Sequence, residues 1–575
     1  MVYSFLKKTG MLWVALAGFG WAAFADIESP QPTIEPAALE AAGIRGLQQA
    51  DPNLDGSGVV IATVCRSITY LDGRPQDDYR FNMRHRSLND ADVLFDDKSD
   101  GKYGISPHAT AIAGVLIGLD PNAALADGTA FQYEGVCPYA SVDAYEFWRF
   151  AALRLFARKP VPADIVTLSL GDIFEDWWTR GVEHLADEKG TVIVAAIGNG
   201  QDARDSTLYP AAGANVIGVG VIDSERDAAG NPSLSRFTLP TAQHSSEGPT
   251  DDLRCKPDLV APGTAIIPDA LTENGYATLA NASSLAAPVV AGTAALLLQK
   301  AQQDPSLRTA LEGMPVNCVI KAVLMNSARK LPYWHKGNIT EDDDGLAPLD
   351  RLQGAGALDA QAALKQFAAG KQAPGDTAPL GWDSRVVDTN ENTLFYAFEA
   401  TDPNAMLTAT LAWNRHFEAR YPFQLRPEQS DLRLELWAMD PNAPAGWVLL
   451  QTSDSPVDTV EHLWTPLSFG FTRYAVAVRF SPEAALPMPA SERFALAWSV
   501  GPDASAQHPL WHDLNADGNI DALDSFLEIF IGSSHLKNLP PEFTQQTLKL
   551  SPQRTELLTT LWPHWKPYLS TNTAQ

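Results

Sequence analysis

Hydrophobic positions in residues 58–369 alternate between short β-branched runs and longer stretches with helical spacing. The short runs are almost wholly apolar, which is typical of strands buried on both faces of a parallel sheet. They are residues 58–64, 163–170, 191–196 and 215–221. Long helical stretches follow His108, Ser284 and Pro315. Strands that alternate with helices predict an α/β fold with a doubly wound parallel sheet.

A different pattern begins near residue 371. Residues 371–500 hold strand-like runs separated by Pro, Asn and Asp, with almost no helical periodicity, and they predict an antiparallel β-sandwich. The clearest runs are residues 394–398, 406–413, 432–437 and 475–480. Residues 501–575 contain an acidic loop and amphipathic helical segments. We therefore expect separate domains at 51–370 and 371–500, preceded by a Pro- and Ala-rich segment, 26–50, with a helix over 36–49.

Composition and charge exclude several classes of protein. A chain of 575 residues should contain about three or four folding units. Its 45% hydrophobic and 19% charged residues are enough to bury cores, so the chain is not disordered as a whole. The balance of 42 Lys and Arg against 69 Asp and Glu gives a net charge of −27, which argues against a nucleic-acid partner.

The first 25 residues have the pattern of a bacterial-type signal peptide. Lys7 and Lys8 precede an apolar run, residues 11–25, that is too short to span a bilayer comfortably and ends in Ala-Phe-Ala before Asp26. We expect export to the periplasm, the cell surface or the medium, with no later membrane span; an uncleaved anchor is the alternative. Export permits disulfides, and the four cysteines allow three complete pairings, none of which the sequence selects. They are Cys65, Cys137, Cys255 and Cys318.

Three segments of the α/β region contain residues suited to acyl transfer. His108 stands at a helix start with small neighbours and could act as a general base. Ser284 begins a helix rich in Ala and Val, where its hydroxyl is exposed and its backbone N–H points at any oxyanion that forms. Asn199 follows a strand in Gly-Asn-Gly and could donate a second hydrogen bond. Taken singly, an ordinary helix cap, a surface histidine and a turn residue explain the same three positions.

The order and surroundings of these residues resemble the subtilases, the subtilisin-like serine peptidases, over roughly residues 50–369. The likeness extends to a Gly-Val-Cys-Pro step, to Ser-Leu-Gly at the end of the second predicted strand, which resembles the family's cleft-lining strand, and to Ser-Ser-Glu-Gly-Pro followed by Lys-Pro-Asp-Leu-Val-Ala-Pro-Gly. These stretches are residues 135–138, 169–171, 245–249 and 256–263.

The resemblance implies a role for each of these residues. It makes His108 the base, Ser284 the nucleophile and Asn199 the oxyanion donor. It also implies that a polypeptide substrate lies as an added strand beside Ser169, Leu170 and Gly171, as for a broadly specific endopeptidase.

One departure from the family concerns the catalytic acid. The family's first strand ends in an aspartate that orients the histidine, and Cys65 stands at that position here. An acidic residue between this strand and His108 could replace the aspartate, or Cys65 could act as a thiolate; otherwise the site is slow or inactive. The candidate acids are Asp72, Asp77, Asp78, Asp90, Asp92, Asp96, Asp97 and Asp100.

The acidic loop near the C-terminus has the spacing of a calcium loop. Oxygen side chains stand at its first, third, fifth, ninth and twelfth positions, a glycine at its sixth, and Asn519 offers a backbone carbonyl at its seventh. The residues are Asp513, Asn515, Asp517, Asn519, Asp521 and Asp524. The loop resembles a dockerin repeat. Dockerins that bind cohesins carry two such repeats and this chain has one, which argues against a cohesin-type partner and favours a joint stiffened by Ca²⁺.

The leading hypothesis is therefore an exported serine endopeptidase that acts through an acyl-enzyme. Two alternatives stay open: an inactive relative used for peptide binding or surface attachment, and a Ca²⁺-dependent assembly protein with the α/β domain as scaffold.

Overall fold

The computed structural model describes most of the chain between residues 33 and 502. The described ranges are 33–66, 70–71, 74–75, 79–96, 104–200, 207–337, 347–389, 393–402, 404–467, 470–482 and 487–502, with the backbone of 548–550 and 569–571. The N-terminal apolar run, the loop at 513–524, the C-terminal helical segments and Asp72, Asp77, Asp78, Asp97 and Asp100 lie outside these ranges. Their predicted roles stay predictions.

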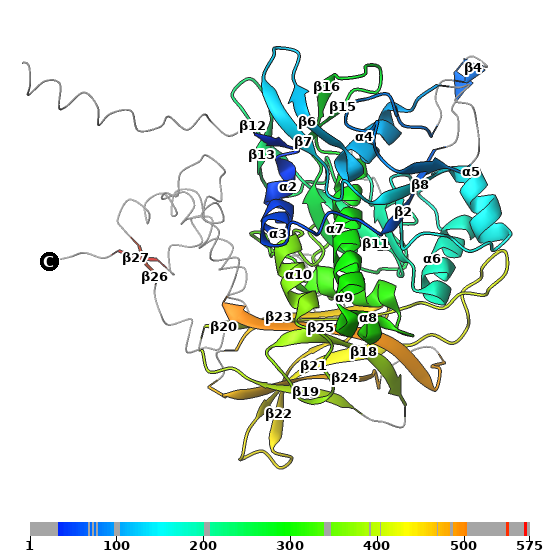
Figure 1. The fold of residues 1–575 in the computed structure, drawn as a ribbon. Helices are drawn as coiled ribbons and strands as arrows, with labels where there is room; N and C mark the ends of the chain where they lie inside the picture. The colour runs from blue at the N-terminus through cyan, green and yellow to red at the C-terminus, as the bar shows by residue number, and fades with distance from the viewer. Residues whose placement is uncertain are drawn as a thin grey trace, which may run out of the picture.

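A seven-stranded sheet forms the centre of the first half of the chain (Figure 1), and every neighbouring pair of its strands is parallel. In spatial order the strands are β14 (Leu259–Pro262), β11 (Ile217–Ile222), β10 (Val192–Ala196), β9 (Ile165–Leu168), β2 (Val60–Cys65), β8 (Ser141–Glu146) and β5 (Val93–Phe95). The four strands predicted from apolar runs are β2, β9, β10 and β11. These strands are apolar throughout because helices cover both faces of the sheet, so side chains on either face are buried.

Helices cover the two faces of the sheet. One face packs against α4 (Pro107–Ile117), α7 (Ser283–Gln303) and α9 (Val316–Asn326), the three predicted long helices. The other face packs against α5 (Phe147–Phe150), the π-helix η1 (Ala151–Phe156) and α6 (Trp177–Lys189). Strand β2 shows the alternation directly, because Ile61 and Cys65 belong to the first core and Ala62 and Val64 to the second.

The prediction of one continuous helix over residues 36–49 is wrong. The segment forms two short helices, α2 (Ala38–Ala41) and α3 (Ile44–Ala50), because Gly43 adopts a left-handed conformation with φ 75°. A Cβ at Gly43 would also lie 3.1 Å from Asp359 Oδ1, at the start of α10 (Ala360–Ala368).

Smaller elements surround this core. They are β1 (Ile34–Glu35), β3 (Tyr70–Leu71), β4 (Arg74–Pro75), β6 (Leu119–Ala124), β7 (Ala130–Glu134), β12 (Ser224–Arg226), β13 (Pro232–Phe237), β15 (Ala265–Pro268), β16 (Tyr276–Leu279) and α8 (Pro305–Leu311), and, beyond residue 502, β26 (Leu548–Leu550) and β27 (Leu569–Thr571).

Two further sheets follow and share one apolar core that includes Trp413, Tyr474 and Trp498. The five-stranded sheet runs β17 (Gly375–Asp376), β19 (Leu394–Glu399), β24 (Arg473–Phe480), β21 (Leu432–Met439) and β22 (Trp447–Ser453). The four-stranded sheet runs β18 (Leu380–Asp388), β25 (Ser491–Pro502), β20 (Ala405–Trp413) and β23 (Val460–Pro466). All neighbouring pairs are antiparallel except β17 and β19.

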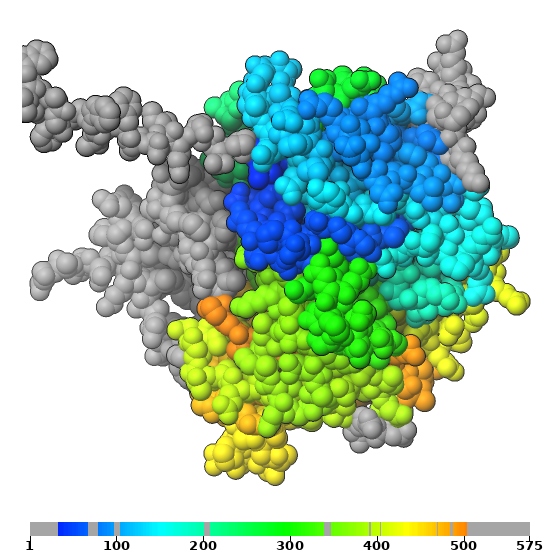
Figure 2. Space-filling view, in the orientation of Figure 1, coloured from blue at the N-terminus to red at the C-terminus, as the bar shows by residue number. Residues whose placement is uncertain are grey.

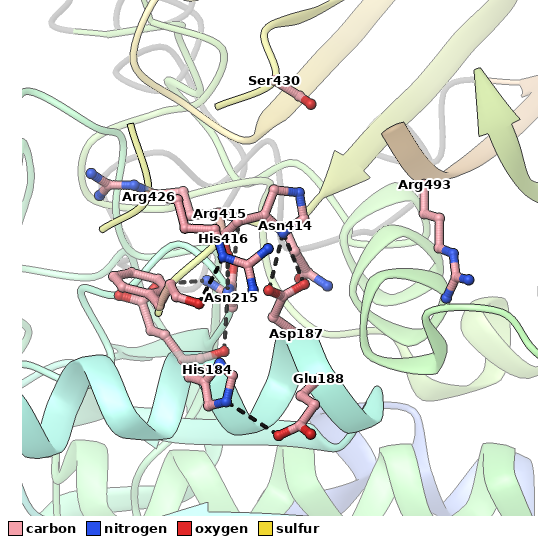
Figure 3. Close-up of polar contacts among 12 residues, drawn as sticks. His184, Asp187, Glu188, Asn215, Asn414, Arg415, His416, Arg426, Ser430 and Arg493 are labelled. Atoms are coloured by element: carbon pink, nitrogen blue, oxygen red, sulfur yellow. Dashed lines mark hydrogen bonds and ion pairs between the residues drawn. The ribbon is translucent and has the colours of Figure 1, made fainter. Parts of the chain in front are cut away.

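The two halves of the chain meet through buried polar contacts, and on the face seen in Figure 2 the C-terminal sheets adjoin the parallel-sheet region. Helix α9 packs on β20 and β25, and Asn317 Nδ2 donates a hydrogen bond to Asn414 Oδ1 at 2.8 Å. The loop after β20 reaches α6, where His416 contacts Asp187 (Figure 3) at 3.0 Å. The other ring nitrogen of His416 contacts Glu492 of β25 at 2.8 Å. Burial would lower the pKa of His416, but the two carboxylates outweigh it and raise the pKa to about 10.

The structure bears on the expectations about membrane-spanning helices and disulfide bonds. Among the described residues one helix, α7, is long and apolar enough to cross a membrane, whereas none was expected; 83% of its apolar window is buried inside the protein, as in a core helix. All four cysteines are free and buried, so none of the three pairings is present.

Candidate active site

The strand order places a crevice at the carboxyl ends of β2 and β9. After β2, the next two strands of the sheet in the sequence, β5 and β8, lie on one side of β2. The later strands β9, β10, β11 and β14 lie on its other side, so the direction in which strands are added to the sheet reverses between β2 and β9. Ligands bind at such a reversal in open parallel sheets. A cleft of about 450 Å³ lies there. Its lining includes His108, Asn199, Ser284 and residues 169–171, so all the predicted reactive and substrate-binding positions share one cavity.

Helix α4 holds His108 at the cleft. Ser106 caps the helix by accepting a hydrogen bond from the Ala109 N–H at 3.1 Å, and Pro107 occupies the first turn. Thr110 Oγ1 donates to the Ser106 carbonyl at 2.8 Å and accepts from the Asn82 N–H at 3.1 Å. These bonds fix the start of the helix, while the His108 side chain is exposed to the cleft.

Ser284 is the second residue of α7 and does not cap it, because the cap is Ala282. Its hydroxyl makes no hydrogen bond to any described residue, while its carbonyl accepts one from Ser169 Oγ at 3.0 Å. The bond from nucleophile to base is often long in enzymes without substrate and tightens when substrate binds. The first N–H groups of α7 have no partner within the helix and favour negative charge in front of them.

Asn199 is oriented by a residue that sequence reasoning passed over. Its Oδ1 accepts hydrogen bonds from both the backbone N–H and the hydroxyl of Ser283, each at 2.8 Å. With the oxygen so engaged, Nδ2 is the part of the amide left to donate into the cleft. Ser283 precedes Ser284 directly, and that adjacency was the only sequence signal for its role.

Cys65 directly precedes the cleft residue Arg66 and is a neutral thiol buried in the core. It is 5% exposed, and burial raises its pKa to about 12. The thiolate that the sequence left open as a replacement for the aspartate therefore does not form near neutral pH.

The described candidate acids between β2 and His108 are hydrogen-bonded, ion-paired or exposed. Asp92 accepts a hydrogen bond from Ser141 Oγ at 2.6 Å, and Asp96 pairs with Arg149 at 3.1 Å. Asp90 is exposed, and none of the three lines the cleft.

Glu146 lies directly opposite Cys65 in the sheet, because the register of β2 and β8 pairs these two residues. Its Oε2 accepts from the Arg149 N–H at 2.9 Å, and its buried Oε1 has no hydrogen-bond partner among the described residues. The strand register that brings Glu146 beside Cys65 is not visible in the sequence.

The residues predicted to bind Ca²⁺ belong to the loop at 513–524, which lies outside the described residues. Within the described part of the chain, no group of three or more His, Cys, Asp or Glu side chains could hold a metal ion.

A serine at a helix start, a histidine and an amide donor on one cleft are the parts of a serine hydrolase. The comparison with known families agrees: the subtilase family matches residues 48–356, and the chain belongs to that family.

Several serine proteases are similar in sequence to this chain. The chain is 27% identical over 268 residues to a thermophilic serine proteinase of Bacillus sp. (strain AK1), covering 46% of this chain and 57% of the relative. It is 28% identical over 300 residues to the serine protease AprX of Bacillus subtilis, covering 47% and 63%. It is 27% identical over 291 residues to halolysin of Haloferax mediterranei, covering 48% and 49%. The chain thus spans between 49% and 63% of the length of these relatives, less than two thirds of each.

Proposed function

We propose that this chain is an exported serine endopeptidase that cleaves polypeptides through an acyl-enzyme on Ser284. The observation that carries the proposal is the single cleft that presents Ser284, His108 and Asn199 together at the carboxyl edge of the sheet. Family membership supports the same reaction class.

In the first half of the reaction, His108 takes the proton of the Ser284 hydroxyl as Oγ attacks the carbonyl carbon of the scissile bond. A C–O bond forms, and the carbonyl oxygen gains the negative charge. Asn199 Nδ2 and the Ser284 backbone N–H donate hydrogen bonds to that oxygen. The C–N bond then breaks, and His108 gives its proton to the leaving amine. Water repeats the sequence to release the acyl group.

The substrate lies in extended form beside Ser169, Leu170 and Gly171 and adds a strand by main-chain hydrogen bonds. Gly171 suits this place because a Cβ there would lie 2.8 Å from the Leu208 side chain and the Tyr209 carbonyl. A peptide held by its backbone is selected weakly by its side chains, which agrees with a broad endopeptidase.

A second candidate function rests on Cys65. A neutral thiol cannot stabilise the imidazolium of His108, so a catalytically inactive relative used for peptide binding or surface attachment would keep the cleft and lose turnover.

Further parts of the proposal concern segments outside the peptidase region. We propose that residues 1–25 direct export, that residues 371–500 form a β-sandwich appendage, and that the loop at 513–524 binds Ca²⁺ and stiffens its surroundings. The shared core of the two antiparallel sheets supports the second of these.

Hydrolysis of a denatured protein such as casein tests the proposal. The wild type should cleave casein at internal bonds, while Ser284→Ala and His108→Ala should lose at least about a thousandfold in rate. Thr293→Ser, a conservative change deeper in α7, serves as the matched control. Casein cleaved equally by wild type and Ser284→Ala would refute the proposal.

A further inference from the structure

Arg66 is the one permanently charged residue among the described residues that line the cleft. It follows Cys65 at the carboxyl end of β2, and its side chain is exposed. The lining residues that the structure describes include no Asp, Glu or Lys. No hydrogen bond or ion pair joins its guanidinium to any described residue. Other arginines of the same domain are paired, such as Arg149 with Asp96.

Arg66 lines the same cleft as residues 169–171, beside which the substrate is proposed to bind. Strands β2 and β9 run parallel and pair Val64 with Leu168. Arg66 directly follows β2, Leu170 lies two residues after the end of β9, and both residues line the cleft. The positive charge therefore lies in the same cavity as residues 169–171 and His108.

No carboxylate among the described lining residues balances the charge of Arg66 within the cleft. An ionised aspartate at position 65 would neighbour Arg66 and offset its charge, but Cys65 is a buried thiol. In a chain of net charge −27, the positive guanidinium of Arg66 attracts an anionic group at one defined place in the cleft. The planar guanidinium matches a carboxylate, to which it can donate two parallel hydrogen bonds.

We propose that Arg66 selects peptides that present a carboxylate close to the scissile bond, on the side that lies along residues 169–171. The carboxylate comes from an Asp or Glu side chain or from the free C-terminus of a short peptide. The inference deepens the proposed function and rests on it for cleavage, whereas the binding preference needs no turnover.

Peptide binding to the full chain carrying Ser284→Ala tests the selection without catalysis. The probes are blocked, labelled ten-residue peptides of Ala, Ser and Leu in which one Glu is moved along the sequence, each matched by a Gln peptide. A second pair differs only in a free or amidated C-terminus. We expect one Glu position, or the free C-terminus, to lower Kd about tenfold in fluorescence anisotropy, and 0.5 M NaCl to reduce the effect.

Variants of Arg66 then test whether this residue causes the preference for a carboxylate. Arg66→Gln should remove the difference between the paired peptides, and Arg66→Glu should reverse it. Arg308→Gln is the matched control, because Arg308 is an exposed arginine on α8, near the end of α7 remote from Ser284. Equal binding of all paired peptides, or a carboxylate preference that persists in Arg66→Gln, would overturn the inference.

The two proposals fail separately. If the wild type cleaves casein but its cleavage sites, mapped by mass spectrometry, are not enriched in Asp or Glu and do not change in Arg66→Gln, the role of Arg66 is wrong while the peptidase stands. If Arg66 governs binding but casein stays intact, the cleft is a carboxylate-selective peptide site and the endopeptidase proposal is wrong.

Discussion

Replacing Cys65 by aspartate should raise the activity of this chain. Cys65 lies at the end of β2 in the core shared with α4, whose second residue is His108. An aspartate at this position differs from cysteine by a carboxylate in place of the thiol. It would hold the imidazole in the tautomer that accepts the Ser284 proton and stabilise the imidazolium that results.

The size of the gain follows from the state of the thiol. With a pKa of about 12, Cys65 is ionised in roughly one molecule in 10⁴ at pH 8, so it supplies almost no negative charge. Loss of the aspartate alone from an active subtilase lowers kcat by roughly 3 × 10⁴, which is about 6 kcal/mol. Because burying a new carboxylate in an apolar core costs a few kcal/mol, we expect Cys65→Asp to raise kcat by about 10² to 10⁴.

The assay is the steady-state hydrolysis of one chromogenic peptide across pH 6 to 10, with active sites counted by stoichiometric labelling. The increase should lie in kcat, with KM changed little, because the carboxylate acts on His108 and does not touch the peptide. Cys65→Asn, polar and of similar size but uncharged, is the matched control and should stay at the wild-type rate.

Two results would refute this reasoning. A folded Cys65→Asp protein with a gain below about threefold would mean that another carboxylate already orients His108, with Glu146 the first to test by Glu146→Gln. An equal gain in Cys65→Asn would mean that the negative charge is not what matters.

Three other predictions concern the oxyanion donor, the domain junction and the calcium loop. Asn199→Ala should lower kcat by about 10² to 10³ with little change in KM, and a loss confined to KM would contradict its role. His416 has a folded pKa of about 10, above the ~6.5 of a free histidine, so its ion pairs stabilise the fold fully below pH ~6.5 and progressively less toward pH 10. His416→Gln should therefore lower the free energy of unfolding by about 3 kcal/mol at pH 6 and by much less at pH 10 in urea denaturation; a loss independent of pH would count against the ion pairs. Ca²⁺ should raise the melting temperature of the wild type but not that of Asp513→Ala/Asp517→Ala; a wild-type melting curve indifferent to Ca²⁺ would exclude the site.

Features that depend on local pattern were predictable from the sequence. Buried parallel strands are continuous apolar runs, so β2, β9, β10 and β11 were predictable. The small residues around His108 and Ser284 marked the helix starts that carry them. Because these starts lie at the carboxyl edge of one sheet, the fold brings them to one cleft.

Features that depend on register or on distant contacts were not predictable. The pairing of Cys65 with Glu146 and the bonds from Ser283 to Asn199 join residues far apart in the chain. The break at Gly43 depends on a backbone conformation that the spacing of apolar residues does not report. The contact of His416 with Asp187 depends on how the C-terminal sheets pack on α6.

Reaction of the wild-type chain with a fluorophosphonate, followed by peptide mass mapping, tests the central claim most directly. The account predicts one covalent adduct on Ser284 that is absent in Ser284→Ala, formed far more slowly in His108→Ala and retained in Ser283→Ala. An unlabelled wild type, or an adduct on Ser283 or Ser169 in place of Ser284, would contradict it.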